Sequence, residues 1–241
     1  MVRDVYEATG DKSWLRGALG TLENEYRFWM TKRMTPTGLN RHFHDDSVPG
    51  ARAFCADIFR YRLNRPVPEN LYERRLAGDH YYAEAETGWD FCPRFDRRCA
   101  DFLPVDLNSN LYRVERNLAH FRRELALPGD GAYDEAAETR RGLMTDLLWD
   151  EREGFYYDFD FTRAERSPVR AGSALHPLYS GAATAYQAKR LVANIGKIEA
   201  DFGVLTCEKF DSGMKYQWDY PNGWPPVQGY AMMGLRTAGF E

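Results

Sequence analysis

An aspartate flanked by aromatic residues is the first feature of this sequence suited to catalysis. Asp90 lies between Trp89 and Phe91, directly after Gly88. Because a carboxylate held against an indole and a phenyl ring loses solvation, we expect the pKa of Asp90 to be raised. A carboxyl group that stays protonated near neutral pH can donate a proton to the leaving oxygen of a glycosidic bond. The alternative is that Asp90 caps a turn whose aromatic neighbours belong to the core.

A second stretch, which we call the tryptophan turn, spans residues 217–228 and contains the groups needed to hold a sugar. Trp218 and Trp224 offer flat faces, and the Pro-Asn-Gly triplet at 221–223 favours a chain reversal between them. Sugars have apolar C–H faces and a rim of hydroxyl groups, which suit aromatic and amide side chains. The alternative is that both indoles pack beneath the turn. The hydrogen-bonding side chains of this stretch are Gln217, Asp219, Asn222 and Gln228.

The histidines and cysteines do not form a recognisable metal site. His42 and His44 precede Asp45 and Asp46, but no further spaced ligands follow, so we expect solvated polar residues there. The cysteines lack the paired spacing of a zinc site and are expected to be free thiols in a reducing compartment. They are Cys55, Cys92, Cys99 and Cys207. We therefore predict neither a metal nor another cofactor.

Composition favours a globular domain and argues against several other classes. The chain has 241 residues, of which 44% are hydrophobic, enough for a substantial core. A net charge of −4 argues against nucleic-acid binding, which favours a basic face. No apolar run is long enough to span a membrane, and Asp4 and Glu7 lie where a secretion signal needs apolar residues. We expect a cytoplasmic protein whose partner is a small sugar molecule.

Hydrophobic periodicity predicts that helices position these groups. The expected helices are 1–33, as a pair with Asp11 as a cap, then 69–87, 108–126, 133–149, 178–195 and 225–238, with a weaker one at 51–62. Segments 34–50 and 91–107 are expected to be irregular, and the aromatic run 155–161 to be a short strand or extended loop. We predict one all-α domain over residues 1–241. Helical hairpins joined by long loops fit an (α/α) toroid-type helical barrel, in which loops at one end build the cleft.

Two motifs of this sequence resemble the trehalase family, glycoside hydrolase family 37. The stretch Glu86-Thr-Gly-Trp-Asp-Phe-Cys-Pro-Arg-Phe95 is similar to the family segment SGWDFSSRW. The tryptophan turn, QWDYPNGWPPVQ, is similar to the family's C-terminal signature. Shorter matches follow the family's order at 39–41, 104–108 and 154–158, so the resemblance covers roughly residues 4–238.

The resemblance implies roles for the matched residues. Asp90 falls on the general acid, and Gly88 falls on a residue that lines the sugar site. The implied activity is inverting hydrolysis of α,α-trehalose, or of a related α-glucoside, to glucose, with no cofactor. The other implied sugar-binding positions are Asn40, Arg94, Gln217, Trp218 and Asp219.

The sequence departs from the family pattern at positions that bear on activity. Gly50, Ala51 and Arg52 replace an Arg-Pro-Glu triplet that holds substrate hydroxyls, and Cys92-Pro93 replaces two serines. The family's catalytic base is a glutamate downstream of the tryptophan turn, whereas Glu208 lies in a similar Glu-Lys-Phe-Asp run before it. Glu208 is therefore either a coincidental match or a substitute base.

These departures leave other interpretations open. One is a non-catalytic carbohydrate-binding relic of the same fold, and another is a related α-glucosidase of altered specificity. Because the family's N-terminal signature and downstream base motif are missing from the sequence, we expect an incomplete barrel. An open barrel exposes apolar helix faces, which predicts a homo-oligomer or a partner chain that supplies the missing helices.

Overall fold

The computed structural model describes residues 1–44, 56–62, 66–211 and 216–240. Most of this chain is helical, and each described strand is only two residues long, so the all-α prediction is confirmed. Short 3₁₀ or π turns lie at Ile58–Arg62, Pro93–Phe95, Cys99–Asp101, Gly172–Leu175 and Ile195–Ile198. The helices are α1 (Val2–Thr9), α2 (Lys12–Lys32), α4 (Leu71–Thr87), α5 (Val105–Glu124), α6 (Asp130–Leu147), α7 (His176–Ser180), α8 (Ala185–Ala193) and α9 (Pro225–Thr237).

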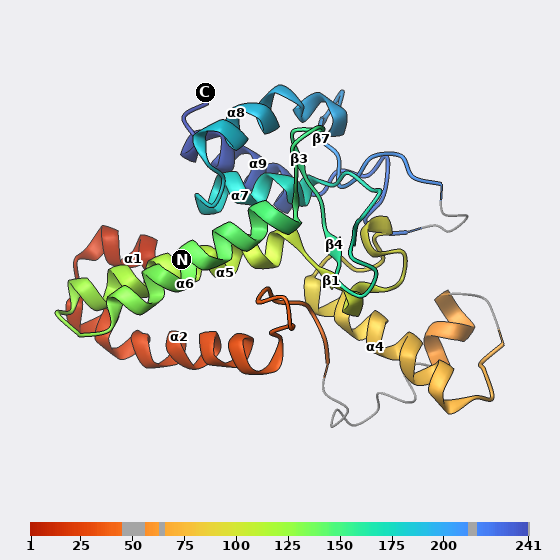
Figure 1. The fold of residues 1–241 in the computed structure, drawn as a ribbon, viewed down its shortest axis with the longest axis horizontal. Helices are drawn as coiled ribbons and strands as arrows, with labels where there is room; N and C mark the ends of the chain where they lie inside the picture. Colours follow the sequence, from red (N-terminus) through yellow and green to blue (C-terminus); the bar gives the residue numbers. More distant parts are fainter. Residues whose placement is uncertain (45–55, 63–65, 212–215, 241) are drawn as a thin grey trace.

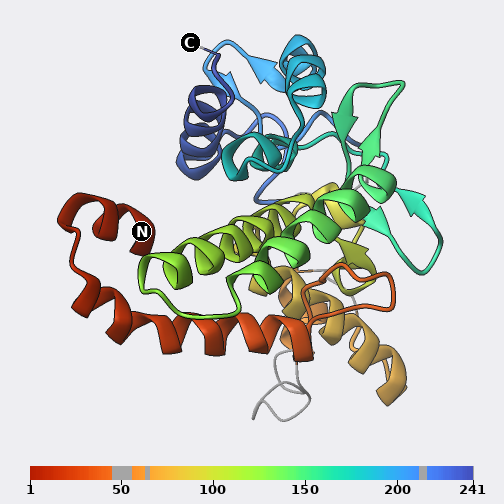
Figure 2. The ribbon, with the colours of Figure 1, turned by 60° about the vertical axis from the view of Figure 1, so that its left-hand side comes forward.

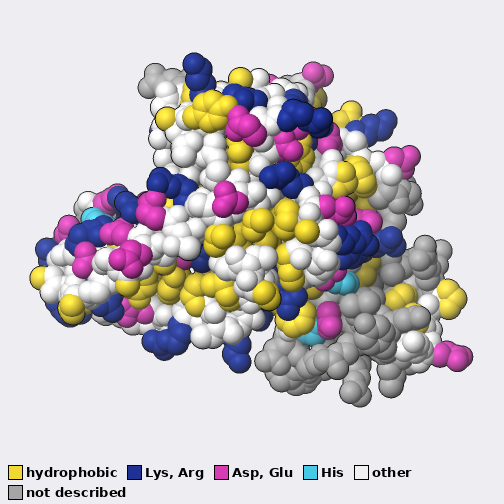
Figure 3. Space-filling view, viewed as in Figure 1, with side chains coloured by type: hydrophobic (Ala, Val, Ile, Leu, Met, Phe, Trp, Pro, Cys, Tyr) yellow, Lys and Arg dark blue, Asp and Glu magenta, His cyan; other side chains and the backbone are white. Residues whose placement is uncertain are grey.

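The central layer consists of α5 and α6, which lie side by side, with α2 along one flank (Figure 1, Figure 2). On the other flank, α7 packs against both α5 and α9. α4 lies apart from that group, beside the 3₁₀ turn Cys99–Asp101. Hydrophobic side chains gather over α5 and α6 on the face shown in Figure 3. The largest buried cluster joins this layer to the C-terminal part of the chain, through Met144 of α6, Leu175, Trp218 and Val227 of α9.

The strands form small antiparallel pairs. β1 (Phe102–Leu103), β4 (Phe159–Asp160) and β5 (Glu165–Arg166) form one sheet in the order β1-β4-β5, with Phe102 opposite Asp160 and Phe159 opposite Arg166. β2 (Trp149–Asp150) pairs with β3 (Phe155–Tyr156), and β6 (Glu199–Ala200) pairs with β7 (Gly203–Val204). The extended run expected at 155–161 is thus confirmed as β3 and β4. Through β1, the larger sheet fixes the segment that leads into α5.

The helix pair at the N-terminus forms as predicted. Gly10 adopts a φ of 65° at the end of α1, and the Asp11 carboxylate accepts the N–H groups of Ser13 and Trp14 at 2.9 Å. The apolar face of α2 packs on α5 in a separate buried cluster. Its buried members are Tyr6, Leu15, Leu19, Leu118, Phe121 and Leu125.

Other helix boundaries differ from the sequence-based expectation. The continuous helix expected at 178–195 is wrong, because Gly181 ends α7 with a φ of 80° and Thr184 starts α8 with a capping box. α5 begins at Val105, earlier than expected, since the carboxylate of Asp158 accepts the Val105 N–H at 2.9 Å. α6 begins at Asp130 and not at 133. Of the weak helix expected at 51–62, residues 56–62 are helical and 51–55 lie outside the described residues.

The described cysteines are buried, whereas several large hydrophobic side chains are exposed. Cys92, Cys99 and Cys207 are buried free thiols, as expected, and Cys55 lies outside the described residues. In the part of the chain that the structure describes, no helix combines the length and apolar character needed to cross a membrane. Large hydrophobic side chains are exposed on α2 and α9, among them Trp14, Phe28 and Met232. Oligomerisation through such faces stays a prediction.

Candidate active site

The Asp90 turn, residues 88–95, begins where α4 ends. Gly88 has a φ of 74°, a left-handed conformation that glycine adopts without strain. The hydroxyl of Thr87 accepts the N–H of Trp89 at 2.8 Å, and Phe91 also has a positive φ, of 57°. This tight reversal buries Trp89 and leaves Asp90 half-buried, while Gly88 stays exposed. The turn therefore leaves Asp90 partly exposed on a backbone that is held in a tight reversal.

The tryptophan turn lies directly against the Asp90 turn. The carbonyl oxygen of Phe91 accepts the N–H of Gln217 at 3.0 Å and the N–H of Trp218 at 3.1 Å. The rings of Trp89 and Trp218 are stacked with centroids 5.2 Å apart. The two stretches that the sequence singled out are thus in contact, although more than a hundred residues of chain separate them.

Four side chains form a column at this contact. The Arg94 guanidinium lies 4.6 Å from the ring centroid of Trp89, which stacks on Trp218, which in turn stacks on Trp224 at 4.4 Å and 9°. Trp218 is only 7% exposed, because near-parallel indoles cover its faces. Trp224, at the end of the column, is half-buried and has the more open ring. The aromatic surface that the sequence assigned to both tryptophans therefore belongs mainly to Trp224.

The polar groups of the tryptophan turn mostly hold the turn itself. Asp219 accepts the N–H of Tyr216 at 3.1 Å and the side-chain amide of Asn222 at 2.9 Å. The side chain of Gln228 bonds to both the N–H and the carbonyl of Val204. Gln217 is exposed, and its carbonyl accepts the indole N–H of Trp224 at 3.3 Å. Its side chain is therefore the amide of this turn best placed to meet a ligand.

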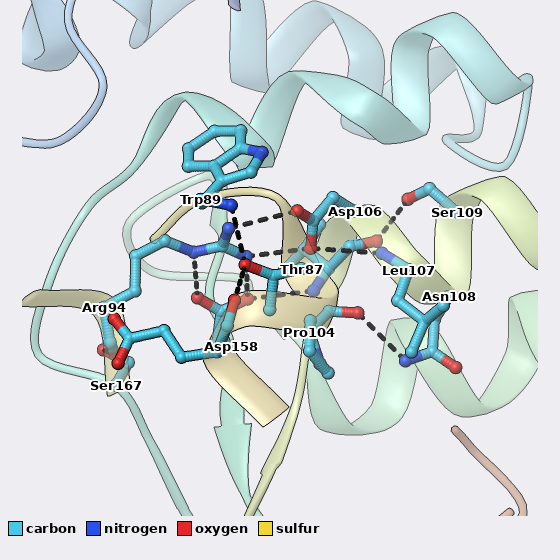
Figure 4. A network of polar contacts seen from close by, with 12 residues as sticks. Thr87, Trp89, Arg94, Pro104, Asp106, Leu107, Asn108, Ser109, Asp158 and Ser167 are labelled. Atoms are coloured by element: carbon cyan, nitrogen blue, oxygen red, sulfur yellow. Dashed lines mark hydrogen bonds and ion pairs between the residues drawn. The ribbon is translucent and has the colours of Figure 1, made fainter. Parts of the chain in front are cut away.

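Arg94 lies beneath the Asp90 turn and is 1% exposed. Its guanidinium forms charge-assisted hydrogen bonds to both oxygens of Asp106 and of Asp158, at 2.8 to 3.1 Å (Figure 4). Burial opposes ionisation of Asp106, but the charge and hydrogen bonds of Arg94 outweigh it and hold the pKa of Asp106 well below its ordinary value. Arg94 thus ties the turn to the first residues of α5. Its implied sugar contact stays a prediction that this placement does not favour.

Asn40 is also buried, with 0% exposure. Its backbone N–H donates to the Asn108 side chain at 2.9 Å, and its side-chain oxygen accepts from Arg140 at 2.9 Å. Arg140 in turn pairs with buried Glu115 at 2.7 Å. Asn40 therefore anchors the loop after α2 on α5 and α6, and its sugar contact likewise stays a prediction.

Glu208 lies on the segment that leads toward the tryptophan turn. One of its carboxylate oxygens accepts the backbone N–H of Arg170 at 2.7 Å, and the other accepts the Arg170 guanidinium at 2.8 Å. The neighbouring Cys207 thiol donates to the carbonyl oxygen of Trp218 at 3.7 Å. Glu208 is thus near the site along the chain but engaged with Arg170, and its role as a base stays a prediction.

Two buried titratable groups beside the site were not singled out from the sequence. Burial raises the pKa of Glu84 on α4 to about 8. Burial lowers the pKa of His176 to about 4, so this ring, which packs on Tyr230, is neutral at pH 7. Helical spacing offered a signal for Glu84, because it follows the buried Tyr81 by three positions and so lies on the same helix face. For His176 the sequence offered none.

The loop after α2 is fastened to the end of α4 by a charged group. Glu86 accepts from Arg33 at 2.6 Å and lies 3.0 Å from the His42 ring, and His44 contacts Asp79. Within the described ranges, no cluster of three or more histidine, cysteine or acidic side chains is arranged to hold a metal ion. Asp45 and Asp46, and the departures at 50–52, lie outside the described residues.

Comparison with known proteins identifies one family model. The Trehalase family model matches residues 1–241. Neutral trehalase Nth1 from Saccharomyces cerevisiae superimposes with a TM-score of 0.79 and 26% identity, covering 92% of this chain and 47% of that protein. The chain therefore spans about half the length of that relative.

Two solved structures from Thermus thermophilus share the fold at lower identity. A GH63 mannosylglycerate hydrolase in complex with Tris matches with a TM-score of 0.68 and 22% identity, covering 99% of this chain and 63% of that one. An uncharacterized conserved protein matches with a TM-score of 0.67 and 21% identity, covering 99% of this chain and 64% of that one. These matches confirm the expected (α/α) toroid-type helical fold.

Proposed function

Because the chain belongs to the trehalase family, we propose that it acts in glycoside hydrolysis, with α,α-trehalose or a related α-glucoside as its substrate. The observation that best supports this proposal is the pair of hydrogen bonds from Gln217 and Trp218 to the carbonyl of Phe91. These bonds hold a half-buried carboxyl beside an aromatic turn. The yeast relative, which is 26% identical to this chain, is named a neutral trehalase.

In this proposal Asp90 is the general acid. Its carboxyl protonates the oxygen that bridges the two sugars, and the C–O bond to the departing sugar breaks as that proton transfers. The exposed backbone at Gly88 leaves room for the sugar beside the acid. The open ring of Trp224 and the side chain of Gln217 bind the apolar face and the hydroxyl rim of the ring. Asp219 and Trp218 hold Trp224 and Gln217 in position within the tryptophan turn.

An inverting reaction also needs a base opposite the acid. The two carboxyl groups stand about 6.5–9.5 Å apart in inverting enzymes, with the attacking water between them. Glu208 fills this role only if a carboxylate oxygen leaves Arg170 to bind the water. The bonds from Arg170 therefore favour the second candidate function, a carbohydrate-binding protein without turnover.

Substitution of Asp90 tests the hydrolase proposal. Asp90→Asn keeps the shape of the side chain and removes the proton donor, so glucose release from α,α-trehalose should fall by about 10²- to 10⁴-fold. Asp96→Asn is the matched control, because Asp96 is exposed and its φ of 43° suits asparagine. Equal loss in both variants, or unchanged activity in Asp90→Asn, would refute the assignment.

Calorimetric titration with trehalose separates the two candidate functions. Binding with glucose release supports the hydrolase, and binding without glucose release supports the carbohydrate-binding protein. Size-exclusion chromatography of the same samples tests the proposed homo-oligomer. A monomeric elution volume at all concentrations would rule the homo-oligomer out.

A further inference from the structure

Glu84 is a buried side chain whose hydrogen bond is directed at the Asp90 turn. It lies in the last turn of α4 and is 2% exposed. Its Oε1 atom accepts the backbone N–H of Cys92 at 2.6 Å, and Cys92 is 0% exposed. Because water does not reach this N–H, Glu84 is the group that satisfies it. The Oε2 atom of Glu84 is buried and has no hydrogen-bond partner in the described part of the chain.

The N–H that Glu84 binds belongs to the same peptide group as the carbonyl that joins the two turns. This peptide group links Phe91 to Cys92. At one end, its oxygen accepts the N–H groups of Gln217 and Trp218 at 3.0 and 3.1 Å. At the other end, its N–H donates to Glu84. A single peptide group close to Asp90 is therefore held from α4 and from the tryptophan turn at once.

The backbone beside this peptide group needs such support. Phe91 has a φ of 57°, in the left-handed region that residues other than glycine seldom adopt. A conformation of this kind persists where the surrounding structure fixes it. Relaxation of this φ would move the peptide group that follows, and so would break its bonds to Glu84 and to the tryptophan turn.

We propose that Glu84 is a positioning residue for the general acid, because it fixes the peptide group through which the Asp90 turn meets the tryptophan turn. This inference deepens the proposed function and rests on it. Glu84 acts through the backbone and sets where Asp90 lies relative to a sugar bound on Trp224. Without the Glu84 acceptor, the Cys92 N–H would be buried and unsatisfied, which favours a rotated peptide group and a displaced acid.

Displacement of the acid should lower turnover more than it weakens sugar binding. The tryptophan turn keeps hydrogen bonds of its own, between Asp219 and Asn222 and between Gln228 and Val204, so its sugar contacts do not depend on Glu84. Proton transfer, in contrast, needs the acid within hydrogen-bond reach of the bridging oxygen. A misplacement of about 1 Å can lower the rate by about 10²-fold.

Two substitutions at Glu84 test this role. Glu84→Leu has no acceptor, so kcat for α,α-trehalose at pH 7 should fall by about 10- to 100-fold, with KM changed by less than about threefold. Glu84→Gln keeps an acceptor oxygen and should retain kcat within about twofold. Glu25→Leu, at an exposed position of α2, is the control and should match the unmodified chain. Equal kcat in Glu84→Leu and Glu84→Gln would overturn the proposal.

Amide hydrogen exchange followed by NMR tests the hold on the peptide group without any turnover. In the unmodified chain, the amides of Cys92 and Trp218 should be protected from exchange. In Glu84→Leu both should exchange at least about tenfold faster, because the peptide group can rotate away from its partners. The amide of Leu19, in the separate cluster on α2, should be unchanged and is the internal control.

Two results of the exchange measurement would overturn the proposal. One is a freely exchanging Cys92 amide in the unmodified chain, which is decisive even if Glu84→Leu does not fold. The other is unchanged protection of the Trp218 amide in folded Glu84→Leu. If the unmodified chain releases no glucose, the proposed function fails, while the exchange data still decide whether Glu84 holds the peptide group.

Discussion

Buried acidic side chains lie on two sides of the Asp90 turn. Those on one side are paired with a cation, and the one on the other side is not. On one side, Asp106 and Asp158 share the guanidinium of Arg94, which bonds to all four of their oxygens. On the other side, the carboxyl of Glu84 accepts the N–H of Cys92, a neutral donor. Burial acts to raise the pKa of both Asp106 and Glu84, but the charge and hydrogen bonds of Arg94 lower that of Asp106 below its ordinary value, whereas the pKa of Glu84 stays raised. The difference shows that partners, and not depth, decide whether a buried carboxyl is charged.

The two sides of the turn also differ in what their interactions do. The charged side ties the turn to α5 and to the segment just before β4, so its interactions hold the backbone in place. The neutral side keeps a proton within electrostatic range of Asp90. The same turn thus has one side held by ion pairs and one side that can titrate.

Removal of Arg94 should have the largest effect on stability. Arg94→Met leaves two buried carboxylates without a cation, and breaking a buried pair in this way typically costs about 3–5 kcal/mol. Urea denaturation at pH 7 measures the loss. Arg97→Met, a change at a more exposed arginine of the same segment, should cost less than about 0.5 kcal/mol. A loss below about 1 kcal/mol in Arg94→Met would show that the charged side does not hold the turn.

Glu84→Gln should change how stability depends on pH. The pKa of Glu84 in the folded chain, about 8, lies above its ordinary value of 4.5, so folding binds a proton between these values. The stability that this proton contributes is complete below pH 4.5 and is lost as pH rises to 8. Glutamine has no such proton, so the variant should gain on the unmodified chain by about 1.4 kcal/mol per pH unit, up to about 4 kcal/mol between pH 5 and 8.

Urea denaturation at several pH values measures that difference, with Glu25→Gln as the exposed control. A constant difference between Glu84→Gln and the unmodified chain across pH 5 to 8 would contradict the neutral assignment of Glu84. In that case the two sides of the turn would be alike in charge.

Trp224→Ala should have the smallest effect of these substitutions, and it should weaken trehalose binding more than it lowers stability. The variant removes the open ring at the end of the column, and aromatic contacts of this kind are worth about 0.5–1.5 kcal/mol. Trehalose affinity measured by calorimetry should therefore weaken by roughly 2- to 13-fold. Tyr186→Ala, at an exposed ring on α8, is the control and should leave affinity unchanged. Unchanged affinity in Trp224→Ala would remove the tryptophan turn from the sugar site.

Local signals in the sequence were sufficient to predict much of the fold. Asp11 caps α2 through its own neighbours, and the apolar spacing of α2, α5 and α6 follows from residues a few positions apart. The break between α7 and α8 was missed, although Gly181 and Thr184 marked it, because the apolar pattern continued across them. The start of α5 depends on Asp158, which is 53 positions away.

The site was harder to predict than the fold, because orientation depends on partners distant in sequence. Motif matching located Arg94 and Asn40, but their burial results from Asp158, 64 positions from Arg94, and from Arg140, 100 positions from Asn40. The stacking of Trp89 on Trp218, which covers one face of the Trp218 ring, likewise depends on residues that are distant in the sequence. Contact between the Asp90 turn and the tryptophan turn, in contrast, agrees with the family resemblance, which assigns the acid and the sugar-binding residues of the two motifs to one sugar site.

A crystal structure of the chain with glucose tests the central claim most directly. The account predicts a sugar ring packed against Trp224, with a hydroxyl or ring oxygen within hydrogen-bond distance of the Asp90 carboxyl. Glucose bound away from both residues, with the Asp90 turn and the tryptophan turn left empty at saturating sugar, would contradict it.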